Sequence, residues 1–141
     1  MNLAFFLRLV GASLIVLSLL HAAFWRLLGW DKEVECLSPL NARVFAVHTL
    51  FIAFVLFALG FLSLARPELL LAPGELPRWI LIGVVLFWIV RLILQPLVFD
   101  RVMRVGWTRP IVVRVGALLL WILYVVVYGA ALIKQSGIEQ R

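Results

Sequence analysis

Residues 40–65 read LNARVFAVHTLFIAFVLFALGFLSLA. This run contains no Asp, Glu or Lys, and its single formally charged residue, Arg43, stands near its beginning. A helix needs about 20 mainly apolar residues to cross the hydrocarbon core of a bilayer. The sequence therefore predicts a membrane-spanning helix over this run.

Three further apolar runs of the same kind occupy residues 5–28, 78–99 and 111–133. Over the whole chain of 141 residues, hydrophobic types make up 65% and charged types 14%, against roughly 45–50% and 25% in soluble domains. A chain this short has too little interior to bury so much apolar surface. We therefore expect an all-α integral membrane protein: a single membrane domain over residues 1–141, built as an antiparallel four-transmembrane-helix bundle.

Prolines mark the ends of these spans. The pair Ser38–Pro39 supplies a helix cap followed by proline at the first helical position, which predicts the start of the second span. Pro67 is expected to stop that span, and Pro77 to open the third. Pro96 is the exception, because it lies inside the third span, where the loss of a backbone donor is expected to kink or end the helix.

The connections between the spans are short, so consecutive helices are expected to be antiparallel neighbours. Lys and Arg are more numerous around the first and third connections than around the second connection and the two termini. Because positive residues favour the cytoplasmic side, we expect these two connections on the cytoplasmic side of a bacterial-type inner membrane. The formal charge of +6 is explained in the same way, because Lys and Arg at the ends of the apolar runs anchor the helices in the membrane. We therefore expect no nucleic-acid partner.

Few polar side chains lie within the spans, and each one is costly in hydrocarbon. At 1.5 Å per residue, His21 and His48 each lie about 10 Å from the first connection, whereas Arg91 and Gln95 lie about 12 Å and about 6 Å from the third. Counting 100° per residue places each of them on one stripe of its helix. The four stripes are Leu14, Ser18, His21 and Trp25; Asn41, Phe45, His48 and Ile52; Val84, Trp88, Arg91, Gln95 and Val98; and Arg114, Ala117, Trp121, Tyr124 and Tyr128.

If the stripes face inward, they predict a ligand-binding site at one level of the membrane. Its candidate residues are His21, His48, Arg91, Gln95, Asn41 and Tyr124, with a rim formed by Arg43, Asp100 and Arg101. Arg91 would attract an anionic or carbonyl oxygen, and the histidines would exchange protons near neutral pH. This chemistry suits an amphipathic or redox ligand such as a quinone or a lipid headgroup.

Three other functions remain open from the sequence. The chain is also suited to be an accessory or structural subunit of a larger membrane complex. His21 and His48 at matched depth also permit a b-type haem with two histidine ligands, whereas two histidines without an acidic or thiolate partner do not predict another metal site. Finally, a homo-oligomer could carry anions past Arg91 as a channel or transporter. The pattern assigns no enzymatic reaction.

Overall fold

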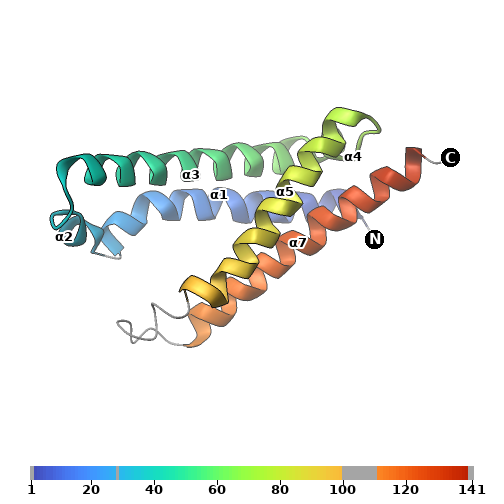
Figure 1. The fold of residues 1–141 in the computed structure, drawn as a ribbon. Coiled ribbons are helices and arrows are strands. Elements are labelled where there is room, and N and C mark those ends of the chain that lie inside the picture. The colour runs from blue at the N-terminus through green and yellow to red at the C-terminus, as the bar shows by residue number, and fades with distance from the viewer. Residues whose placement is uncertain (1, 28, 100–110, 140–141) are drawn as a thin grey trace. The chain divides into compact units, whose positions relative to one another are not determined.

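The computed structural model describes residues 2–27, 29–99 and 111–139 (Figure 1). Within this part of the chain the structure is helical and contains no strand, so the predicted all-α fold is confirmed. The elements are α1 (Leu3–Leu27), α2 (Trp30–Val34), α3 (Pro39–Ala65), α4 (Pro67–Leu71), α5 (Glu75–Leu94), the π-helix η1 (Gln95–Phe99) and α7 (Ile111–Glu139). Four helices, namely α1, α3, α5 continued by η1, and α7, are long and apolar enough to cross a membrane.

The outer surface of these helices is also apolar. Leu50 and Phe54 on α3 are 68% and 66% exposed, and Ile133 on α7 is 75% exposed. Soluble proteins rarely expose large apolar side chains in continuous areas. Helix length, composition and surface together are compatible with a multi-pass membrane protein.

The predicted cap at the start of α3 is confirmed. Ser38 Oγ accepts a hydrogen bond from the backbone N–H of Asn41 at 3.3 Å, and Pro39 is the first residue of the helix. At the other end α3 stops at Ala65, and Pro67 begins the short helix α4. Gly74, with φ of 136°, then lets the chain turn into α5, because a side chain rarely tolerates that conformation.

The largest differences from the expected helix boundaries are in α5 and α7. Helix α5 begins at Glu75, so Pro77 lies within its first turn instead of opening it; proline needs no hydrogen-bonded N–H there. Helix α7 continues beyond residue 133 to Glu139. Gln135 supports this extension, since its Nε2 donates to the backbone oxygen of Ala72 at 2.6 Å and thereby fastens α7 to the chain before α5.

Pro96 disturbs the third span as expected. It lies in η1, where residues Gln95–Phe99 adopt a π-helical turn that continues α5. A wider turn accommodates a residue without an N–H group, because the regular α-helical bond to the preceding turn is missing there. The turn begins at Gln95, whose side chain is buried.

The chain divides into two compact units, one of Leu7–Pro67 and one of Met1–Phe6 with Glu68–Arg141. The first unit holds the antiparallel α1–α3 pair (Figure 1). Its backbones touch: a Cβ atom added at Gly11 would lie 2.6 Å from Leu64 N and 2.7 Å from Gly60 O. Further along, Ser18 Oγ donates to the backbone oxygen of Ala53 at 2.7 Å. Both contacts define one register, with residue 11 opposite 60 and residue 18 opposite 53.

The second unit holds the α5–α7 pair, which Figure 1 also shows running antiparallel. The Trp88 and Trp121 rings stack across this pair, with centroids 5.2 Å apart and an interplanar angle of 17°. Helix α4 and the Ala72 contact of Gln135 close the opposite end of the same unit. The predicted antiparallel neighbours are therefore present within each unit.

Candidate functional site

A cluster of aromatic and polar side chains lies between α5 and α7, next to the π turn. We call it the tryptophan–arginine cluster; it consists of Trp88, Arg91, Gln95, Trp121 and Tyr124. The members on α5 and η1 are spaced i, i+3 and i+7, and the α7 members i and i+3, so each set shares one helix face. Arg91 is half-buried, whereas the other four members are buried.

Gln95 joins the two helices through a single oxygen atom. Its Oε1 accepts from Arg91 Nη1 at 2.9 Å and from Trp121 Nε1 at 3.3 Å. A side-chain amide oxygen has two lone pairs, so these two donors use its accepting capacity. The donor from Trp121 crosses from α7 to α5, which makes Gln95 a polar link within the apolar helix pair.

Arg91 is held against the helix pair by its charge as well as by this hydrogen bond. Its guanidinium carbon lies 4.9 Å from the centroid of the Trp121 ring, within the range of a cation–π interaction. Trp121 is backed by Trp88, and the Trp88 ring centroid lies 4.5 Å from that of Tyr124. The arrangement fixes one positive charge on an aromatic wall inside a membrane-spanning segment.

The cluster is richer in hydrogen-bond donors than in acceptors. Arg91 carries five N–H donors, each indole one and the Gln95 amide two, whereas the acceptors of the cluster are the Gln95 oxygen and the Tyr124 hydroxyl. The Trp88 Nε1 atom is buried and has no hydrogen-bond partner in the part of the chain that the structure describes. A group that brings oxygen acceptors therefore matches the chemistry of this cluster.

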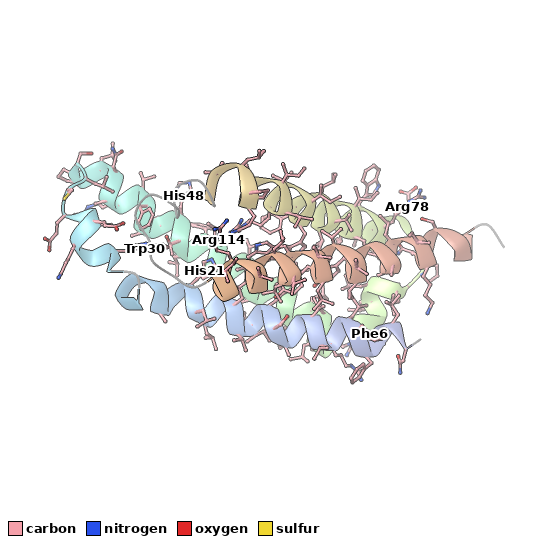
Figure 2. The ribbon with its side chains drawn as sticks, turned by 90° about the horizontal axis from the view of Figure 1, so that it is seen from below. Phe6, His21, Trp30, His48, Arg78 and Arg114 are labelled. Atoms are coloured by element: carbon pink, nitrogen blue, oxygen red, sulfur yellow. The ribbon has the colours of Figure 1, made fainter. Side chains whose placement is uncertain are left out.

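His21 and His48 lie in the other unit, on α1 and α3 (Figure 2). The register of the α1–α3 pair places His21 level with residue 50, so it is about 3 Å from the level of His48 along the helix axes. Counted from the contacting positions Gly11 and Gly60, His21 lies about 80° round α1 and His48 about 120° round α3. Because the helices are antiparallel, both rotations lead to the same side of the pair.

Both histidine rings are oriented by their own helices. His21 Nδ1 lies 2.8 Å from Leu17 O, and His48 Nδ1 lies 2.8 Å from Val44 O. A carbonyl oxygen only accepts, so Nδ1 carries the proton in each ring and the lone pair of a neutral ring is on Nε2. Histidine ligands of metals are commonly oriented in this way.

A shared haem at these two rings stays a prediction, and the register of the α1–α3 pair disfavours it. Two axial ligands must approach one iron from opposite faces, whereas His21 and His48 project side by side from one face of the pair. Close to their level, Ser18 Oγ donates to the Ala53 oxygen at 2.7 Å, so the two helices are in contact there.

We therefore expect protein purified from haem-replete cells to absorb only in the ultraviolet range of its aromatic residues. The measurement is an absorption spectrum of the oxidised and the dithionite-reduced protein. A Soret band that shifts on reduction and is lost in both His21→Ala and His48→Ala would contradict this expectation and support a haem with these two histidine ligands.

The remaining predicted residues have different surroundings. Asn41 and Arg43 are exposed near the start of α3. Asp100 and Arg101, predicted for the rim, lie outside the described residues. The structure thus brings Arg91, Gln95 and Tyr124 together, and it places His21, His48, Asn41 and Arg43 in the other unit.

Trp88 and Trp121 were not predicted as site residues, although both lie on the predicted stripes. Large aromatic residues at helical spacing usually pack in a core, and spacing does not reveal where an indole N–H points. The available signal was their position one turn from Arg91 and from Tyr124, respectively.

No protein-family model matches the chain, and no curated protein or solved structure matches it either. The fold and the cluster define the class coarsely, as an all-α chain with the four apolar helices of a multi-pass membrane protein.

Proposed function

We propose that this multi-pass membrane protein binds an amphipathic ligand, a quinone or a lipid headgroup, at the tryptophan–arginine cluster. One observation supports this most: Gln95 Oε1 already accepts from Arg91 and Trp121, and the buried Trp88 Nε1 of the same cluster has no acceptor among the described residues. A ligand oxygen would supply the missing acceptor. The distribution of Lys and Arg supports an inner-membrane location with the first and third connections in the cytoplasm.

Arg91 is the member of the cluster that first meets such a ligand. It is half-buried, whereas its neighbours Trp88 and Gln95 are buried, so it is the member reached from the surface of the helix pair. A guanidinium offers several donors in one plane, and its hydrogen bonds to oxygen are stronger than those of neutral donors. The ligand's apolar tail would remain in the surrounding lipid.

His21, His48 and Asn41 lie in the other unit, and their part in ligand binding stays a prediction from the sequence. The orientation of the two rings supports a role in proton exchange, because a neutral ring with Nδ1–H bonded to a backbone carbonyl accepts a proton at Nε2. Such a role would matter for a ligand that takes up protons when it is reduced, as quinones do.

The test is a binding titration of the protein in phosphatidylcholine nanodiscs with decylubiquinone and, separately, with phosphatidylglycerol. Arg91→Met is expected to weaken binding of the true ligand roughly 10-fold to 100-fold, the range for a lost hydrogen bond to a charged donor. Arg78→Met removes the same charge from the exposed beginning of α5 and should bind as the unchanged protein does.

Two results would overturn the proposal. The first is saturable binding of either probe that Arg91→Met and Arg78→Met leave equally intact. The second is no binding of either probe by unchanged, folded protein.

A further inference from the structure

We infer that the ligand is a quinone-type ring, one of whose carbonyl oxygens accepts a hydrogen bond from Trp88 Nε1. This inference rests on the proposed function and chooses between its two ligand classes. It starts from the buried Trp88 donor, which has no acceptor among the described residues.

The Trp88 ring packs against neighbouring aromatic rings, whereas its N–H has no hydrogen-bond acceptor among the described residues. The side chain is 1% exposed, and its ring contacts those of Phe87, Trp121 and Tyr124 at centroid distances of 4.5–5.2 Å. Yet Nε1 is buried without a hydrogen-bond partner among the described residues. Buried indole N–H groups usually find a partner, because an unmade hydrogen bond in an apolar medium costs free energy. If the position required only an aromatic ring, phenylalanine would fill it without the free-energy cost of an unmade hydrogen bond.

Among the described residues, the charges near the cluster favour a neutral carbonyl over a phosphate. Arg91 is the cation of the cluster, and its charge already faces Trp121 and Gln95 Oε1. Arg114 on α7 is seven residues from Trp121, about 10 Å along the helix axis. On α5, Arg78 lies 13 residues from Arg91, about 20 Å away. A buried phosphate is best held by several converging cations, whereas a quinone carbonyl is neutral and needs donors.

The aromatic composition of the cluster supports the same choice. Three of its five members are aromatic rings, and the rings of Trp88 and Trp121 are nearly parallel. Flat aromatic groups pair favourably with such walls. A carbonyl oxygen on a flat ring would accept from Trp88 Nε1, and the ring itself would pack against the aromatic side chains. Arg91 would supply a second donor to the same ligand.

The experiment compares Trp88→Phe with Trp79→Phe in phosphatidylcholine nanodiscs, with decylubiquinone as the probe. Trp88→Phe keeps an aromatic ring and removes the N–H, so decylubiquinone should bind roughly 3-fold to 10-fold more weakly, as for one lost neutral hydrogen bond. Trp79 lies exposed on the same helix, and its replacement should leave binding unchanged. Decylbenzene, which has the tail but no carbonyl, should not compete.

A second readout uses the unchanged sequence in case Trp88→Phe does not fold. With 15N-labelled tryptophan, the Trp88 indole N–H resonance should shift downfield when decylubiquinone is added, while that of Trp79 stays in place. Single Trp→Phe replacements elsewhere assign the Trp88 signal by elimination.

The outcomes separate this inference from the proposed function. Binding of phosphatidylglycerol but not decylubiquinone, lost in Arg91→Met, would keep the proposed function and overturn the quinone assignment. Decylubiquinone binding that depends on Arg91 but neither weakens in Trp88→Phe nor shifts the Trp88 resonance would overturn the role of Trp88. Failure of both probes to bind would overturn the proposed function itself.

Discussion

Replacing Gly11 with alanine is expected to lower the free energy of unfolding by about 3 kcal/mol, the upper part of the range for overpacking a close contact. The added Cβ would lie 2.6 Å from Leu64 N and 2.7 Å from Gly60 O. Both are backbone atoms, so no side chain can rotate away, and α1 and α3 must move apart. That movement would also strain the hydrogen bond from Ser18 to Ala53.

The matched control is Gly83→Ala on α5. Apart from its own helix backbone and adjacent residues, no described atom lies within 4 Å of a Cβ added there, so the same chemical change should be neutral or slightly stabilising through helix propensity. Unfolding can be followed by circular dichroism during titration with sodium dodecyl sulfate. Equal midpoints for Gly11→Ala and Gly83→Ala would show that the α1–α3 backbones do not touch as described.

The second large effect is expected for Gln95→Leu, at about 2 kcal/mol of lost stability. Leucine has a similar volume but no acceptor, so Arg91 Nη1 and Trp121 Nε1 both lose the oxygen that they share. A hydrogen bond between membrane helices is modest, at about 0.6 kcal/mol on average. Here one replacement removes the interhelical bond from Trp121 and also the bond from the charged Arg91 within the same span.

Gln95→Glu separates the loss of the acceptor from a general disturbance of the π turn. A carboxylate keeps an oxygen in the same position and pairs with Arg91, so stability should stay close to that of the unchanged protein. The same unfolding titration measures both variants. If glutamate destabilises as much as leucine, the hydrogen bonds of the Gln95 oxygen are not what stabilises the α5–α7 pair.

The helices could be predicted because their determinants are local. Apolar runs of sufficient length gave the four spans, and Ser38–Pro39 and Pro67 marked the ends of α3. The short helix α2 within the first connection was not predicted, since it has only the length of a turn or so and little periodicity. The disturbance at Pro96 was predicted, but its form was not, because a kink, an end and a π turn all remove the same hydrogen bond.

The candidate site was less accessible from the sequence. Helical spacing placed Arg91 and Gln95 on one face, and the structure joins them at 2.9 Å. The link to Trp121 depends on side-chain rotamers and on the register of α5 against α7, which no spacing rule contains. The joint site with His21 and His48 stays a prediction, although their shared level follows from the Gly11 and Ser18 contacts.

Native mass spectrometry of the protein, released gently from the membranes in which it was made, tests most directly whether the tryptophan–arginine cluster holds a ligand. We predict an adduct with the mass of a quinone or a lipid on the unchanged protein, retained in Arg78→Met and lost in Arg91→Met. Folded protein without any adduct, or an adduct that persists equally in Arg91→Met, would contradict the assignment of a ligand to this cluster.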